Sequence, residues 1–194
     1  MPKRNEIIKK LKEMLNPERF EHSLRVEKIA LALAKKHGAD RRKISLAALL
    51  HDCARRYDRK GLLKIAGKMG LKIDPIRKFE PKLFHGEIGA RLAREEFGVK
   101  PADILRAIRS HTTGKPGMSK LEKIVYLADH IEEGRNFPEV GKLRKLAFRD
   151  LDQAVFESAS AMLKYLLREK LPIYPETIHT RNSYLRNTAS CPAT

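Results

Sequence analysis

The chain lacks tryptophan and has two cysteines, Cys53 and Cys191, which lie far apart and without Cys-x-x-Cys spacing. Their number and spacing exclude a disulfide framework and a zinc knuckle, and fit a reducing compartment. No apolar run reaches the roughly 20 residues that a membrane-spanning helix needs, and residues 1–15 alternate charge with Ile and Leu, unlike a signal peptide. We therefore expect a cytoplasmic protein with no membrane partner.

Aromatic residues are also scarce, at 6%. The 24 acidic residues are outnumbered by 41 Lys and Arg, which gives a formal net charge of +17. Such a charge predicts an anionic partner. Lys and Arg are spread over nearly every segment, so solvated helix faces explain them better than a dedicated nucleic-acid surface. Without interleaved aromatic side chains there is no platform for stacking bases. Nucleic acid is therefore not the expected partner.

Helical periodicity dominates what remains, with no competing stretch of alternating or β-branched residues. The sequence predicts an all-α, single-domain helical bundle of about nine helices with an irregular C-terminal tail. The helices are expected at 4–15, 16–37, 40–52, 59–69, 87–97, 101–111, 119–131, from 138, and 151–170. An irregular connection is expected between Asp74-Pro75 and His85-Gly86. We divide the chain into an N-terminal helix packed on the domain (1–15), the domain itself (16–170) and the tail (171–194), whose last ten residues are predicted to fray.

His51 and Asp52 end an apolar stripe formed by Ile44, Ala47 and Ala48 at helical spacing. Neighbouring side chains on a helix point about 100° apart, so this pair can reach one metal ion only at a helix end. The position of the pair meets that condition. Taken alone, the dipeptide is common enough to occur by chance.

Four further polar residues occupy inward or helix-end positions: His22, His85, His111 and Asp129. His111 ends a second stripe, and Asp129 lies inside an apolar run, where an unpaired carboxylate costs several kcal/mol and so needs a cationic partner. Each histidine alone could be a hydrogen-bonded core residue. The whole set favours a divalent metal, and its mixed histidine and carboxylate chemistry suits iron, manganese or zinc without choosing among them.

The order His22, His51-Asp52, Asp129 resembles the HD-domain metal-dependent phosphohydrolases. More specific motifs are similar to the YqeK-type family, the symmetrical bis(5′-nucleosyl)-tetraphosphatases, over residues 19–177. These motifs are Leu83-Phe84-His85-Gly86, Gly89-Ala90, Ser110-His111-Thr112-Thr113-Gly114, Ala128-Asp129-His130-Ile131-Glu132 and Arg135. Two departures are visible: Glu133 stands where the family commonly has proline, and His130 is a variable position.

This resemblance implies an HD-domain bundle that hydrolyses diadenosine tetraphosphate to two ADP, with one or two iron ions as the cofactor. By resemblance, His22, His51, Asp52 and Asp129 bind the first metal, and His51, Asp52, His85 and His111 are the catalytic residues. His85 and His111 either hold a second metal with bridging Asp52 or contact the phosphates. A metal there would lower the pKa of bound water, and the resulting hydroxide would attack phosphorus.

Substrate contacts are expected from cationic and hydroxyl groups near these ligands. Arg25 lies one helical turn after His22, Arg135 follows Asp129 closely, and Thr113 and Gly114 can offer a hydroxyl and backbone N–H groups to phosphate. A protonated His85 or His111 could act as general acid. His130 is a further candidate through its neighbour Asp129. The resemblance places the nucleoside end at the segment Pro172, Ile173, Tyr174, Pro175, Glu176 and Thr177.

Two alternatives remain open. The metal site could act on another nucleotide, such as a nucleoside triphosphate, a guanosine polyphosphate alarmone or a cyclic dinucleotide, because shared ligands determine chemistry better than specificity. The chain could instead be a basic RNA-binding module with a structural metal. A homodimer is also left open.

Overall fold

The computed structural model describes residues 2–185, and in this range every regular element is helical. Eleven α-helices and two short 3₁₀ helices follow one another along the chain. They are α1 (Arg4–Met14), α2 (Pro17–His37), α3 (Arg41–Leu50), η1 (Cys53–Arg56), α4 (Arg59–Lys68), α5 (Pro75–Phe79), η2 (Pro81–Phe84), α6 (His85–Glu95), α7 (Ala102–Ser110), α8 (Lys120–Ile131), α9 (Val140–Ala147), α10 (Leu151–Arg168) and α11 (Pro175–Ser183). The prediction of an all-α fold is confirmed.

Local capping signals fix most helix ends. Asn16 accepts a hydrogen bond from the N–H of Arg19 at the start of α2, and Gly38 ends this helix in the left-handed conformation, with φ of 62°. Asp40 caps the start of α3, where its side chain accepts hydrogen bonds from the N–H groups of Arg42 and Lys43. Ser119 and Glu122 form a capping box at the start of α8. The ends predicted at these residues are confirmed.

Two helices were not predicted. At α5 the sequence predicted an irregular connection, yet Asp74 caps the helix and Pro75 takes its first position, the same signal as at Asn16-Pro17. Five residues are too few to show apolar periodicity. Helix α11 corrects the expected irregular tail: its two buried residues, Thr177 and Thr180, are polar, so no apolar stripe announces it. The predicted frayed end falls almost wholly on residues 186–194, which lie outside the described residues.

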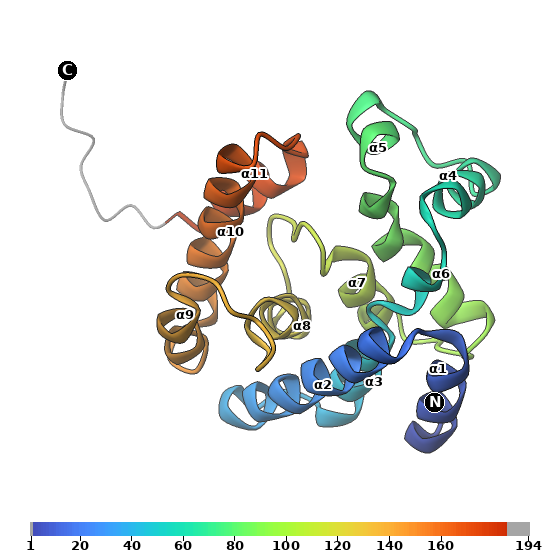
Figure 1. Ribbon diagram of the computed structural model, residues 1–194. Coiled ribbons are helices and arrows are strands. Elements are labelled where there is room, and N and C mark those ends of the chain that lie inside the picture. Colours follow the sequence, from blue (N-terminus) through green and yellow to red (C-terminus); the bar gives the residue numbers. More distant parts are fainter. Residues whose placement is uncertain (1, 186–194) are drawn as a thin grey trace.

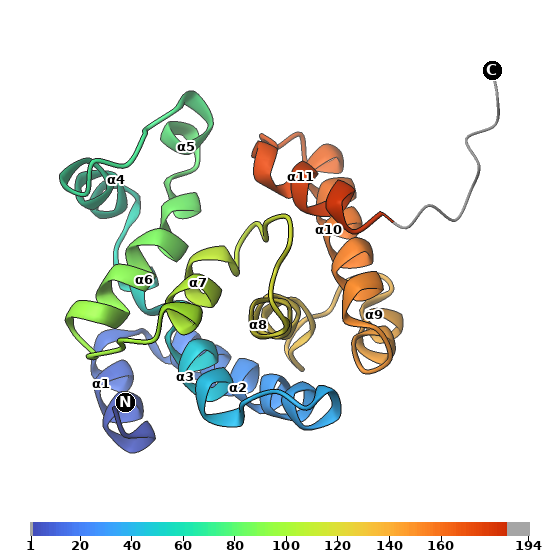
Figure 2. The same cartoon turned by 180° about the vertical axis from the view of Figure 1, so that it is seen from behind.

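Helix α8 lies in the middle of the molecule and contacts α2, α3, α7, α9 and α10 (Figures 1 and 2). Helices α9, α10 and α11 gather on one side of it, and α4, α5 and α6 on the opposite side. Both predicted stripes are buried, with Ile44, Ala47, Ile104 and Ala107 fully inaccessible. Chain segments distant in sequence are thereby brought to one centre. Within residues 2–185, none of the helices combines the length and hydrophobicity needed to cross a bilayer.

Helices α6 and α7 approach each other closely at Gly86. A Cβ atom at this position would lie 2.5 Å from the carbonyl oxygen of Arg109, so only glycine fits here without a shift of backbone. Gly86 follows His85, and Arg109 lies two residues before His111. The close approach of the helices therefore sets these two histidines side by side.

Candidate metal centre

His51 and Asp52 lie at a helix end, as predicted. His51 takes the C-cap position of α3 and Asp52 the position just before η1. His51 is fully inaccessible and Asp52 is 4% exposed. The turn between the two helices directs both side chains toward one point, which a continuous helix would not do.

Two groups of ligand-type atoms meet there, and they share His51. The first comprises His22, His51 and Asp129, and the second His51, Asp52 and His111, with the ligand atoms of each group within 4.8 Å of one another. In the first group, His22 Nε2 lies 3.1 Å from Asp129 Oδ1 and 3.3 Å from His51 Nε2. These atoms come from α2, from the end of α3 and from α8.

Asp52 joins the second group to His85. Its Oδ1 lies 3.2 Å from His85 Nε2 and 3.7 Å from His111 Nε2, while its Oδ2 lies 3.7 Å from His51 Nε2. The two carboxylate oxygens therefore face different histidines. The structure brings all six predicted ligands together, with Asp52 between the two sides.

The four histidines present their Nε2 atoms because every Nδ1 is engaged. The Nδ1 of His51 lies 2.6 Å from the carbonyl oxygen of Ala48, and that of His111 lies 2.7 Å from the carbonyl oxygen of Ile108. His85 makes the equivalent contact with the carbonyl of Lys82. A carbonyl only accepts hydrogen bonds, so each Nδ1 carries the proton and donates it. In the neutral ring, Nε2 is left with a free lone pair, the form that binds metals.

The Nε2 atoms of His85 and His111 lie 2.8 Å apart. Two lone pairs cannot face each other at this distance without repulsion, so a proton or a metal ion must lie between the rings. A site that collects lone pairs and carboxylates in this way fits a divalent cation.

Burial and charges within the centre hold His51, Asp52 and Asp129 in the forms that ligate. Burial lowers the pKa of His51 to about 4, against the opposing charge of Asp52. Burial would raise the pKa of Asp52, but the charge of His51 and the contacts of His111 and His85 hold it well below 3.8. Burial would likewise raise the pKa of Asp129. The hydrogen bond of His22 and the charges of His51 and Arg135 outweigh it and hold this pKa well below its usual range. At neutral pH, His51 is thus uncharged and both carboxylates are ionised.

Two residues of the centre were missed by sequence reasoning. Glu132, 2% exposed, contacts the Nδ1 of His22 at 3.3 Å and accepts from Arg25 at 2.7 Å. Arg19 donates to Asp52 Oδ2 at 3.0 Å. A signal existed for both, since Arg19 lies three residues before His22 and Glu132 three residues after Asp129, one turn away on the same face. Glu132 thus orients His22, and Arg19 orients Asp52.

The predicted phosphate contacts Arg25 and Arg135 are engaged with carboxylates. Arg25 pairs with Glu132, and Arg135 Nη2 lies 2.6 Å from Asp129 Oδ1. The expected cationic partner of Asp129 is therefore Arg135, together with His22. His130 faces away from the ligand groups: its Nδ1 lies 3.0 Å from Ser158 Oγ and its ring packs on Tyr126. Burial lowers the pKa of His130 to about 4.

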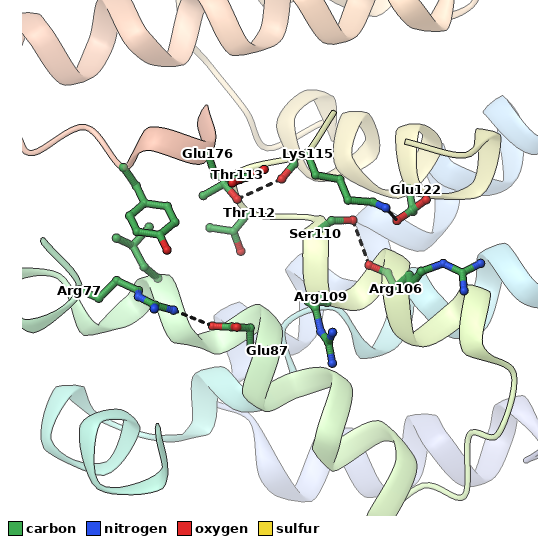
Figure 3. A pocket seen from close by; sticks show the side chains of 13 residues that line it. Arg77, Glu87, Arg106, Arg109, Ser110, Thr112, Thr113, Lys115, Glu122 and Glu176 are labelled. Atoms are coloured by element: carbon green, nitrogen blue, oxygen red, sulfur yellow. Dashed lines mark hydrogen bonds and ion pairs between the residues drawn. The ribbon is translucent and has the colours of Figure 1, made fainter. Parts of the chain in front are cut away.

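A pocket of about 330 Å³ adjoins the centre on the side of Thr112. The Oγ1 of Thr112 lies 3.1 Å from His85 Nε2, so this residue belongs to both. Figure 3 shows Arg77 reaching toward Glu87, with Arg106 and Arg109 on the neighbouring helix and Glu176 above Thr112. The lining residues are Arg77, Leu83, Glu87, Arg106, Arg109, Ser110, Thr112, Thr113, Gly114, Lys115, Glu122, Tyr174 and Glu176.

The pocket includes some of the residues that were predicted to contact substrate. From the segment 172–177, Tyr174 and Glu176 line it. Thr177 is buried, Pro175 is exposed at the start of α11, and Pro172 and Ile173 are partly buried. These last four do not line the pocket.

Gly114 has a different part from the one predicted. Its N–H donates to the carbonyl of Ser110 at 2.9 Å, so this N–H is not free for a phosphate. Gly114 has φ of 67°, and a Cβ there would lie 2.5 Å from Thr180 Cγ2. Thr180 Oγ1 donates to the carbonyl of Thr113 at 2.9 Å. The glycine thus lets α11 dock on the turn, which carries Tyr174 and Glu176 to the pocket.

Comparison with known proteins agrees with this geometry. The family model described as HD domain matches residues 19–134. A protein of Halalkalibacterium halodurans named "Bis(5′-nucleosyl)-tetraphosphatase, symmetrical" is 41% identical over 182 residues, 94% of this chain and 97% of its own. A Bacillus subtilis protein with the same name is 38% identical, over 92% and 96% of the two chains.

A crystal structure from Clostridium acetobutylicum, described as a predicted HD superfamily hydrolase involved in NAD metabolism, superposes with a TM-score of 0.90. It is 36% identical and covers 95% of this chain and 97% of its own. Similarity thus extends over the whole fold and not over the ligand motifs alone. The chain belongs to the HD domain family and, within it, to the family of the proteins named symmetrical bis(5′-nucleosyl)-tetraphosphatase.

Proposed function

We propose that the protein is a metal-dependent hydrolase that cleaves diadenosine tetraphosphate symmetrically into two ADP. The observation that carries the proposal is the pair of ligand groups that share His51. Asp52 connects them to His85, beside which the centre meets a pocket at Thr112. The names of the relatives, which match almost the whole chain, support this substrate. The net charge of +17 suits a polyanionic substrate.

In this proposal His22, His51, Asp52 and Asp129 hold a divalent metal, with iron preferred and manganese or zinc as alternatives. When bound, the metal supplies charge neutralisation at the phosphoryl oxygens and a lowered pKa for water. Asp52 is expected to be shared if a second ion lies between His85 and His111. If no second ion binds, these two histidines contact phosphate, and a protonated His111 donates to the departing ADP.

The substrate lies across the centre and the pocket. Thr112 offers a hydroxyl group beside His85, and Thr113 lines the pocket next to it. Tyr174 and Glu176 are the proposed contacts of the nucleoside. Arg25 and Arg135 remain proposed phosphate contacts, each able to use donors that Glu132 and Asp129 leave free, because a guanidinium has five N–H groups. ADP is then the product on both sides of the cleaved bond.

The test is product analysis with metal-loaded protein and diadenosine tetraphosphate. We expect ADP as the sole nucleotide product, and loss of at least about 100-fold in kcat/KM for His51→Ala and Asp52→Ala, because each removes a ligand that also orients its neighbours. His37→Gln is the matched control, since His37 contacts the carbonyl of Ala147 and not the centre. Equal amounts of AMP and ATP would rule out symmetrical cleavage.

A substrate panel then decides specificity. Comparing kcat/KM for diadenosine tetraphosphate with a nucleoside triphosphate, a guanosine polyphosphate and a cyclic dinucleotide tests the alternatives directly. We expect the dinucleoside tetraphosphate to be preferred, because relatives named for this activity match almost the whole chain. A higher value for any other member of the panel would replace the proposed substrate.

A further inference from the structure

Arg55 carries a guanidinium beside the metal centre that has no hydrogen-bond or ion-pair partner among residues 2–185. It lies in η1, three residues after Asp52, and its backbone N–H donates to the carbonyl of Asp52 at 2.8 Å. The side chain is partly buried, and among residues 2–185 no hydrogen bond or ion pair holds it. The next residue, Arg56, pairs with Glu96 instead. An arginine left in this state has five unused donors.

The surroundings of Arg55 make its position costly without a ligand. Burial lowers the pKa of Arg55, and the neighbouring charge of Arg19 acts in the same direction, against the charges of Asp52, Asp129 and Glu80. A guanidinium nevertheless keeps its proton in proteins, so burial leaves an unpaired positive charge. The positive charges of Arg19 and Arg55 repel each other, and a bound anion between them would offset that repulsion.

The carboxylates that could neutralise Arg55 are already engaged. Asp52 accepts from Arg19, Asp129 from Arg135, and Glu132 from Arg25. Glu80 pairs with Arg59. The centre thus has three carboxylates against four guanidiniums, those of Arg19, Arg25, Arg55 and Arg135. A divalent metal adds further positive charge, which favours a ligand with several negative charges.

We propose that Arg55 binds non-bridging phosphate oxygens of the substrate on the Asp52 side of the metal centre. The inference rests on the proposed function, for it names a residue that holds the polyphosphate of that reaction. Arg25 and Arg135 would have to share their guanidiniums with Glu132 and Asp129, whereas Arg55 can present a planar fork to phosphate without breaking a contact.

Equilibrium binding to the metal-loaded protein tests this, with ADP and inorganic tripolyphosphate as the two probes. We expect Arg55→Gln to weaken the binding of both probes by about 10- to 100-fold, because it removes one or two charge-assisted hydrogen bonds. Arg94→Gln is the matched control. Arg94 is exposed near the C-terminal end of α6, so this substitution removes the same charge away from the centre. Arg55→Lys is expected to fall between wild type and Arg55→Gln, because it keeps the charge and loses the fork.

Two results would overturn the inference. One is that Arg55→Gln binds both probes within twofold of Arg94→Gln. The other is that ADP alone is weakened, which would place Arg55 against the nucleoside. Thermal melting checks that the variants fold, and the lysine variant remains informative if glutamine destabilises the protein. If wild type yields no ADP from diadenosine tetraphosphate, the proposed function fails. Tripolyphosphate binding still tests whether Arg55 contacts phosphate.

Discussion

Each histidine of the metal centre is oriented by the acceptor on its Nδ1, and the acceptor differs in kind. Three histidines donate to a backbone carbonyl three residues earlier, which ties the ring to its own helix end. His22 instead contacts the Glu132 carboxylate from a different helix. A carboxylate on the far nitrogen makes the ring a stronger ligand than a carbonyl does.

Substituting Glu132 should therefore weaken metal binding without removing a ligand. We expect Glu132→Gln to lower metal affinity about 10- to 100-fold, since the amide cannot hold His22 and Arg25 as a carboxylate does. Metal titration followed by competition with a chelator measures the change. Glu133→Gln is the control, because Glu133 pairs with Lys28 in an exposed position. Equal affinities of the two variants would contradict the role of Glu132.

At the scale of elements, the close contact of α6 and α7 positions His85 against His111. Gly86→Ala should destabilise the fold by about 1–3 kcal/mol, because its Cβ would press on the backbone of Arg109. For a chain of this size, the melting temperature would fall by about 3–10 °C. Gly67→Ala in α4 is the matched control, because its Cβ meets nothing within 4 Å. That change should stabilise by about 0.5–1 kcal/mol. A Gly86→Ala variant as stable as wild type would refute the tight approach.

The connection between η1 and α6 depends on pH. The hydrogen bond from Arg56 is the main cause that lowers the pKa of Glu96 from 4.5. A carboxyl with a lowered folded-state pKa stabilises the fold above its unfolded pKa, and this contribution disappears as pH falls through the folded value. Glu96→Gln should therefore be less stable than wild type at pH 7, by less than about 1 kcal/mol because water still screens this partly exposed pair.

Denaturant unfolding from pH 7 to pH 3 measures that difference. The gap between wild type and Glu96→Gln should close below about pH 4.5, as Glu96 takes up its proton. Glu95→Gln is the control on the same helix, since Glu95 pairs with exposed Arg91. A gap that stays constant across this range would show that Glu96 does not act through its charge.

For the whole molecule, the metal centre joins segments from α2 to α8, so an ion bound there should stabilise the entire fold. A metal present at about 100 times its Kd adds about 2.7 kcal/mol, which raises the melting temperature by about 5–10 °C. We expect chelation to lower the melting temperature by this amount and added metal to restore it. Asp52→Asn should not respond, because its two oxygens face both sides of the centre. A response of equal size in this variant would place the stabilising ion elsewhere.

Local sequence was sufficient for much of this protein. Asn16-Pro17, Gly38, Asp40 and Ser119 fixed helix ends through hydrogen bonds with residues no more than five positions away. Apolar spacing identified the inward faces that end in His51 and His111. Both signals depend on neighbours in the chain, so they can be read without knowing the fold.

Contacts between helices were beyond sequence alone. Helical periodicity says which face is buried but not which helix it meets, so the pairing of His22 with Glu132 and of Arg19 with Asp52 appears only in the folded chain. The sequence has 41 Lys and Arg, and its patterns do not show which guanidiniums pair with a carboxylate. Helix α11 lacks an apolar stripe because threonines dock it. The sequence thus determined most of the helices and the inward histidines. Tertiary packing decided the partners of their side chains and left Arg55 without one among the described residues, because those distances depend on how helices far apart in the chain approach one another.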